Sequence, residues 1–345
     1  MIRARRCSQL VEQSPKFWAR RRSRTLSRGV SVGTGIDPLP VPGDRRTRPR
    51  QRVKSRPKKT VIRACGGSSH LFAQIQPLFG KLVIRFTSCR SPLNLIENSS
   101  YARPSFRRPY LAAVYDAWHP RSVREDYDFY LSRILTADAV LDVGCGTGTL
   151  LHEARLAGHS GRLCGIDPAP GVLNRARMRT DIEWVLGDLQ SAGWTAQFDL
   201  IVMTGHAFQA LVSDEDLRGF MAAVRHALVP GGCFAFETRN PSVRAWENWT
   251  PENAVVVELP DRSSVQIATE VVIPFDGKTL TFTHRFCGKH RSLPRVSQST
   301  LRFLEADELS NLLENAGLRI EQRFGGFDGS PLGPLSPEII TLATR

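Results

Sequence analysis

The chain has 345 residues and a formal net charge of +14, from 47 Lys and Arg against 33 Asp and Glu. That length allows two domains, or one large α/β domain with a tail. No run approaches the roughly 18 apolar residues of a membrane span, and the sequence at Met1 lacks the apolar core of a secretory signal. The sequence therefore predicts neither a membrane-spanning helix nor a secretory signal peptide.

The positive charge is confined to the first hundred residues. Residues 1–100 contain 22 basic and 4 acidic residues, whereas residues 101–345 contain 25 basic and 29 acidic ones. A run of like charge broken by prolines at 42–59 favours disorder, and we interpret 1–100 as a basic, largely disordered extension. Three functional readings stay open: nucleic-acid binding, organelle targeting, or attachment to an acidic membrane surface. A plain extension, or a stretch translated from a wrong start codon, is the alternative.

The seven cysteines argue against a zinc site. Their number is odd and no two have Cys-x-x-Cys spacing. Several lie in apolar strand patterns, which predicts reduced, buried thiols in a cytoplasmic protein without a bound metal.

From residue 101 onward, helical and strand patterns alternate. Helices are expected at 122–135, after a capping-box start at Ser122–Glu125, and at 147–157, 171–179 and 214–228. Short, mostly apolar strands are expected at 139–143, 162–167, 182–187, 198–204 and 232–237. This alternation predicts an α/β fold, in which a Rossmann-like, doubly wound parallel sheet is covered on both faces.

Residues 254–303 interrupt this alternation. Strands are expected at 255–259, 265–273, 279–286 and 297–304, with a hairpin turn at Asp276-Gly277. They form an antiparallel insertion within a domain that spans 101–345. A helix at 305–316 and two closing strands at 318–324 and 338–344 follow.

The most informative motif is Val140-Leu-Asp-Val-Gly-Cys-Gly-Thr-Gly-Thr-Leu150. It predicts a buried strand that enters a tight glycine turn and then a helix, where the backbone can approach a ligand closely. Dinucleotide turns usually have Gly-x-Gly-x-x-Gly spacing, whereas here Asp142 precedes Gly144 and Gly146. A carboxylate there would repel a pyrophosphate but suit an ammonium group.

Two further acids follow the next two strands. Asp167 stands about 20 residues beyond the glycines, where a carboxylate can accept both ribose hydroxyls. Asp188, in Gly187-Asp-Leu189, can accept a hydrogen bond from an adenine amino group. Each acid alone could be an ordinary helix cap. Three in this order indicate S-adenosylmethionine (SAM) as the cofactor.

Residues 101–345 resemble the class I SAM-dependent methyltransferases. The resemblance rests on the glycine turn, Gly165-Ile-Asp-Pro168, Glu183–Asp188, Met203-Thr-Gly-His-Ala-Phe-Gln209 and Leu228–Glu237. These segments are similar to bacterial small-molecule methyltransferases. The resemblance implies a seven-stranded sheet whose last strand is antiparallel.

The resemblance also implies how SAM would be held. Asp142, Gly144, Cys145 and Gly146 would surround the methionine end, and Asp167 the ribose. The adenine would lie against Pro168 and near Asp188 and Leu189. Cys145 is interpreted as a small residue that fits a crowded turn, not as a nucleophile.

The acceptor side is expected where the fourth strand ends. Thr204, which is also expected to contact the cofactor, lies there with His206 and Gln209. His206 is the candidate base or acceptor-orienting residue because histidine titrates near neutrality. His206 could instead cap the next helix or bond the backbone. Arg239 and Asn240 could hold an anionic acceptor or fix the start of the insertion. Tyr115, which we place before the first helix, could close a lid over the cofactor or pack beneath one.

Two functions from different classes follow. The first is SAM-dependent methyl transfer to a small molecule, with acceptor selectivity set by the insertion, unless the insertion is a dimer surface. The alternative is a nucleic-acid-binding protein or RNA methyltransferase that uses the basic extension. The acidic balance of 101–345 argues against nucleic acid outside that extension. Neither the acceptor atom nor the oligomeric state follows from the sequence.

Overall fold

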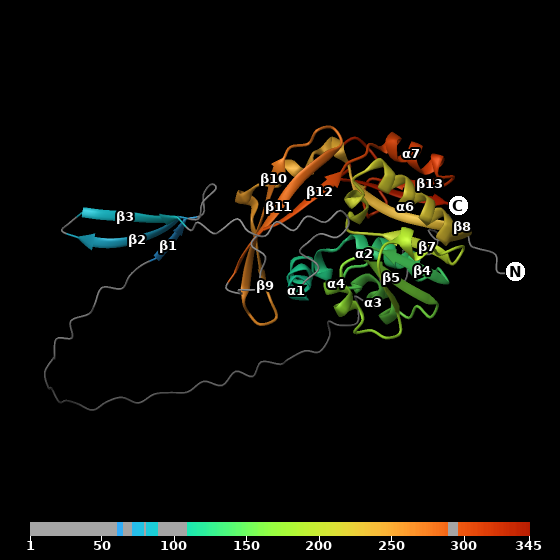
Figure 1. The fold of residues 1–345 in the computed structure, drawn as a ribbon, viewed down its shortest axis with the longest axis horizontal. Helices are drawn as coiled ribbons and strands as arrows, with labels where there is room; N and C mark the ends of the chain where they lie inside the picture. The colour runs from blue at the N-terminus through green and yellow to red at the C-terminus, as the bar shows by residue number, and fades with distance from the viewer. Residues whose placement is uncertain (1–60, 65–70, 79–80, 89–108, 289–295) are drawn as a thin grey trace, which may run out of the picture. The chain divides into compact units, whose positions relative to one another are not determined.

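The computed structural model describes residues 61–64, 71–78, 81–88, 109–288 and 296–345 (Figure 1). Strands β1 (Val61–Ala64), β2 (Leu71–Leu78) and β3 (Lys81–Ser88) pair as an antiparallel sheet in the order β1-β2-β3. They lie in one compact unit, and residues 109–345 lie in the other. The sequence analysis assigned no strand to 61–88. Its expectation of disorder for the rest of residues 1–100 falls outside the described residues.

The larger unit is built on a seven-stranded sheet with the order β13-β14-β8-β7-β4-β5-β6. Neighbours from β8 to β6 are parallel, whereas β14 is antiparallel to both β8 and β13. The strands are β4 (Ala139–Val143), β5 (Arg162–Asp167), β6 (Glu183–Leu186), β7 (Phe198–Met203), β8 (Leu228–Arg239), β13 (Arg319–Phe324) and β14 (Glu338–Thr344). The expected α/β sheet with an antiparallel last strand is confirmed.

Helices cover both faces of this sheet. They are α1 (Pro109–Trp118), α2 (Asp126–Ile134), α3 (Thr149–Leu156), α4 (Pro170–Ala176), α5 (Leu189–Ala192), α6 (Asp214–Ala227) and α7 (Ala306–Asn315). Short 3-10 turns are η3 (Arg121–Val123), η4 (Ala207–Ala210), η5 (Pro241–Val243), η6 (Ala245–Asn248) and η7 (Pro251–Asn253).

The strand side chains alternate between two apolar cores. In β7, Ile201 and Met203 join the core beneath α6 and α7, whereas Leu200 and Val202 join the core beneath α2 and α3. This period of two places every parallel strand between two layers of helices. The carboxyl ends of β4, β5, β6 and β7 therefore meet at one edge of the sheet, where ligands bind in such folds.

The insertion forms a separate antiparallel sheet with the order β12-β11-β10-β9. Its strands are β9 (Val255–Glu258), β10 (Ser264–Ile273), β11 (Thr279–Gly288) and β12 (Val296–Arg302). Each pairs with its neighbour in sequence, as the turn signal predicted. Apolar residues of α1 pack on this sheet, and Ala112 on the other side of the helix contacts Ala169 and Val172. Helix α1 thus connects the insertion to the Rossmann-like core.

Two local predictions are wrong. Tyr115 lies inside α1 rather than before the first helix. No capping box forms at Ser122–Glu125, because that segment folds as η3 and α2 begins at Asp126 without a side-chain cap. Cys145 and Cys164 are buried and carry free thiols, as the sequence predicted.

Candidate active site

The glycine turn follows β4 as the sequence predicted. Gly144, Gly146 and Gly148 all have positive φ, at 73°, 57° and 76°. The amides of Gly144 and Cys145 donate to Ile166 O at 2.8 and 3.2 Å, which fixes the turn against β5. A Cβ atom on Gly148 would lie 2.4 Å from the Trp184 ring, so the indole occupies the space that this glycine leaves open.

A cavity opens over the carboxyl ends of β4 to β7. Seven of the nine residues proposed for the cofactor line it, together with Tyr115 from α1: Gly144, Gly146, Asp167, Pro168, Asp188, Leu189 and Thr204. The structure thus brings together three strand ends that the sequence identified separately. The other two, Asp142 and Cys145, are 2% and 8% exposed and lie outside the lining.

Asp142 has the properties expected of an ammonium ligand. Its Oδ1 is buried and has no hydrogen-bond partner among the described residues. Burial raises the pKa of this carboxyl to about 7, although the Arg124 guanidinium opposes the rise. An incoming cation would compensate a carboxylate that burial otherwise destabilises.

Asp167 organises the turn from the end of β5. Its Oδ2 accepts from the Gly146 amide at 3.0 Å and its Oδ1 from the Ala169 amide at 2.8 Å. Burial raises its pKa to about 6, and these two amides oppose the rise. Asp188 caps α5, because its Oδ1 accepts from the Ser191 amide at 2.9 Å. Both acids therefore have structural roles and also line the cavity.

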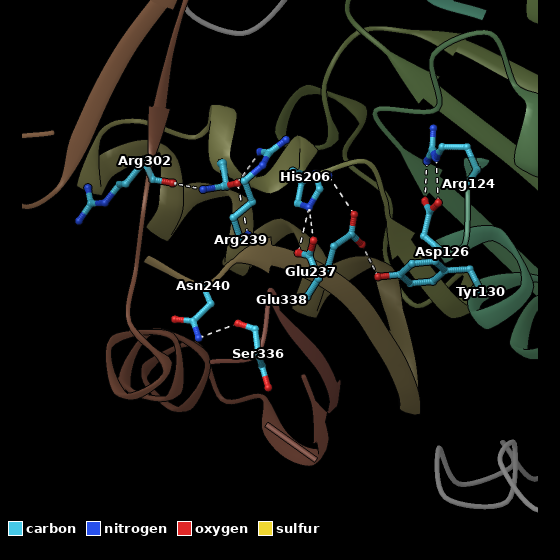
Figure 2. Close-up of polar contacts among 11 residues, drawn as sticks. Arg124, Asp126, Tyr130, His206, Glu237, Arg239, Asn240, Arg302, Ser336 and Glu338 are labelled. Atoms are coloured by element: carbon cyan, nitrogen blue, oxygen red, sulfur yellow. Dashed lines mark hydrogen bonds and ion pairs between the residues drawn. The ribbon is translucent and has the colours of Figure 1, made fainter. Parts of the chain in front are cut away.

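His206 occupies the turn after β7. Its neighbours Gly205 and Ala207 line the cavity, and its backbone is left-handed with φ 59°. Figure 2 shows its ring directed at Glu338, with Nε2 2.9 and 3.0 Å from the two carboxylate oxygens. Its backbone amide donates to Glu237 Oε1 at 2.9 Å, and Tyr130 Oη also donates to Glu237.

Gln209, Arg239 and Asn240 bond within the protein. Gln209 is 1% exposed, donates to Arg302 O at 3.1 Å and accepts from Arg239 Nη1 at 2.9 Å. Asn240 donates to Ser336 O at 2.9 Å (Figure 2). It also accepts from the Ser242 amide at 3.1 Å. These bonds join η4, the end of β8 and β12. They fit the structural alternative, in which these residues fix the start of the insertion.

The sequence analysis missed three charged residues around Gly205 and His206: Arg124, Glu237 and Glu338. Arg124 forms a bidentate pair with Asp126, at 2.8 and 2.5 Å, and its guanidinium lies 3.5 Å from the position of a Cβ on Gly205. The sequence pattern could have indicated Glu237, because this glutamate lies in an apolar strand, where it is fully buried, and a buried glutamate needs a partner. No pattern indicated Arg124 or Glu338, since each lies at the edge of an element.

Within the described residues, no group of three or more His, Cys, Asp or Glu side chains is arranged to hold a metal ion. Among the same residues, no helix combines the length and apolar character that crossing a bilayer requires.

Comparisons with known proteins agree with this geometry. Residues 140–232 match a family model described as a methyltransferase domain. The cypemycin N-terminal methyltransferase of Streptomyces sp is 25% identical over 226 residues, which cover 62% of this chain and 85% of that protein. The dTDP-4-amino-2,3,4,6-tetradeoxy-D-glucose N,N-dimethyltransferase of Saccharopolyspora spinosa is 24% identical over 238 residues. These cover 64% of this chain and 90% of that protein.

The structure is similar to that of the CcbJ methyltransferase from Streptomyces caelestis. The TM-score is 0.54 at 20% identity, with 69% of this chain and 98% of that one covered. This likeness concerns the fold, while the family match and the two relatives concern the activity. Together they support a class I SAM-dependent methyltransferase, with the methyltransferase domain itself matched over residues 140–232.

Proposed function

We propose that this enzyme transfers the methyl group of SAM to a small-molecule acceptor bound between the cavity and the inserted sheet. The observation that carries the proposal is the buried Asp142 Oδ1, without a partner among the described residues, behind a cavity lined by Asp167 and Asp188. These three carboxylates, as hydrogen-bond acceptors, fit an amino group, a ribose and an adenine in the order in which SAM presents them.

We assign Asp142, with the turn at Gly144–Gly146, to the methionine end of SAM. Arg124 and Tyr115 approach the same place, because Gly205 lies near both side chains. A guanidinium and a phenol there would suit the SAM carboxylate. Asp167 would take the ribose, and Asp188, Leu189 and Pro168 the adenine. The small side chain of Cys145 would fit the crowded turn, and Thr204 would form part of the cavity wall.

When bound, SAM supplies an electrophilic methyl group on a positively charged sulfur. The protein then has to place the acceptor, exclude water and take a proton if the acceptor carries one. We assign the proton to His206, since its flanking residues line the cavity. Arg239, held by Gln209 and over the Trp249 ring at 5.3 Å, would form part of the acceptor wall with Asn240.

One relative is named as an N,N-dimethyltransferase of an amino sugar, and the other as an N-terminal methyltransferase. Amines are therefore the first acceptors to test, ahead of hydroxyl, carboxyl and thiol compounds. The inserted sheet would set selectivity, since β12 is hydrogen-bonded to the turn after β7 through Gln209 and Arg302.

The test is calorimetric titration of the full chain with SAM and S-adenosylhomocysteine, followed by a screen for S-adenosylhomocysteine release with amines and other small molecules. Micromolar SAM binding is expected, and Gly144→Val should abolish it, because a Cβ there already lies 3.2 Å from Ala207 Cβ. A folded chain that binds neither compound would refute the proposal.

The nucleic-acid alternative is tested with the basic extension. If methyl transfer to a small molecule is the function, residues 101–345 alone should keep the SAM affinity of the full chain. Salt-dependent RNA binding that disappears with residues 1–100 would favour the alternative instead.

A further inference from the structure

Two glutamates from different strands hold the residue after β7. Glu237 of β8 accepts from the backbone amide of His206, and Glu338, the first residue of β14, contacts the imidazole Nε2 at 2.9 Å. Figure 2 shows both carboxylates directed at this one residue. The backbone and the side chain of His206 are therefore fixed independently.

This fixation offsets an unfavourable backbone. Gly205 and His206 both have positive φ, 67° and 59°. For histidine the left-handed conformation costs about 1–2 kcal/mol. Such outliers persist where surrounding contacts determine the conformation, and they concentrate at functional sites. Here the strained residue lies between two residues that line the cavity.

The His206–Glu338 pair lies among other charged groups. Burial raises the pKa of Glu338 to about 8, while Arg239 opposes the rise and Asp126 adds to it. Burial likewise raises the pKa of Glu237 to about 8, against the hydrogen bond from Tyr130. The groups that face the pair are Glu237 and Arg239 of β8, Asp126 and Tyr130 of α2, and Arg124 just before α2.

An imidazole and a buried carboxylate in contact exchange protons as a unit. Without a shared proton the pair carries one negative charge, on Glu338, and with one it is neutral overall. Removing the carboxylate would leave an imidazolium without its nearest counter-charge. The proton affinity of His206 therefore depends on Glu338.

We propose that Glu338 is the positioning residue for His206 and that the two side chains together accept the proton released by the methyl acceptor. One N–H or O–H bond of the acceptor breaks, its electron pair stays on the acceptor atom, and the proton moves to the pair, whose charge rises from −1 to 0. This inference depends on the proposed function, because that function identifies the proton donor as the methyl acceptor. The contact between His206 and Glu338 does not depend on the proposed function.

The experiment is NMR on the full chain with ¹⁵N-labelled histidine, saturated with S-adenosylhomocysteine. The ring nitrogens of the eight histidines are followed from pH 5.5 to 9.5. His206→Asn identifies the His206 signals by their loss, and asparagine tolerates the left-handed backbone. We expect Glu338→Gln to lower the proton affinity of His206 at least tenfold, a pKa decrease of about one unit. The matched control Glu314→Gln, on the exposed face of α7, should leave it unchanged.

An identical His206 titration in Glu338→Gln and the control would overturn the inference. Glu338→Asp keeps the charge, so it should restore most of the raised affinity. If Glu338→Gln unfolds, Glu338→Asp is measured in its place. A proton affinity of His206 that is higher in Glu338→Asp than in the wild type would count against the pairing. Wild-type protein that binds no SAM in calorimetry but shows the coupled titration would refute the proposed function and leave the pair intact.

Discussion

Asp167 combines a structural and a ligand-binding role in one carboxylate. Both of its oxygens accept backbone amides, from Gly146 and Ala169. We expect Asp167→Asn to keep the Ala169 bond through the amide oxygen but to weaken SAM binding at least tenfold, because the amide cannot accept at both positions. Calorimetry measures the affinity, and thermal unfolding shows whether the turn survives. An unchanged affinity in a stable variant would exclude the ribose role.

Two glycines of one turn separate backbone strain from steric overlap. A Cβ on Gly146 meets nothing within 4 Å, whereas one on Gly148 lies 2.4 Å from the Trp184 ring. Gly146→Ala should cost about 1–2 kcal/mol, from its positive φ alone. Gly148→Ala should add about 1–3 kcal/mol of overpacking. Urea denaturation compares the two, and equal losses would mean that the indole can move aside.

The site residues divide by how far their contacts reach along the chain. The placement of Asp142, Asp167 and Asp188 could be predicted, because strand periodicity puts them near strand ends that a parallel sheet must bring together. The contacts of His206 with Glu237 and Glu338 could not. They join residues 31 and 132 positions apart, from the parallel strand β8 and the antiparallel strand β14, and the sequence does not reveal the register of either strand.

At the scale of elements, helix α1 has the most consequential packing. Leu111 is 2% exposed and contacts the inserted sheet, while Ala112 packs against Ala169 and Val172, which line the cavity. Leu111→Ala should cost about 2–4 kcal/mol of unfolding free energy. Leu156→Ala, at a 74% exposed position on α3, should cost much less. Chemical denaturation measures both, and similar values would show that α1 is only loosely docked.

The core strands and the inserted meander could be predicted from apolar periodicity and the Asp276-Gly277 turn. Helix α1 was not predicted, because Tyr115 was placed before the first helix, in a lid or packed beneath one. The capping-box prediction at Ser122 failed because a different local arrangement forms there. Arg124 pairs with Asp126, and the segment before it forms a 3-10 turn. A capping-box pattern in the sequence therefore does not by itself place the start of a helix.

For the whole molecule, buried carboxyl groups determine how stability depends on pH. Burial raises the pKa values of Asp167, Asp142, Glu237 and Glu338 to about 6, 7, 8 and 8. The folded chain therefore holds protons that the unfolded chain has already released. For an acid this means that stability is greatest at low pH and falls as pH rises from about 4 through the folded pKa.

We expect the ligand-free protein to be more stable at pH 6 than at pH 8.5. Asp142→Asn should flatten the dependence by on the order of 1 kcal/mol over that interval, since it removes one of the titrating groups. Glu314→Gln, at an exposed position, is the control. Denaturant titrations at several pH values measure the slope, and a rise in stability toward pH 8.5 would contradict the assignment of raised pKa values.

The Trp184 indole has a consequence for how this protein can diversify. It fills the space beside Gly148 and also beside Gly165, where a Cβ would lie 2.5 Å from the same ring. A large aromatic residue at 184 therefore overlaps a side chain at 148 or 165 unless the ring shifts. In related sequences the three positions should vary together, so that an alanine at either glycine accompanies a smaller residue at 184. The glycine turn after β4 thus limits which residues can occupy position 184 in β6, two strands away in the sheet.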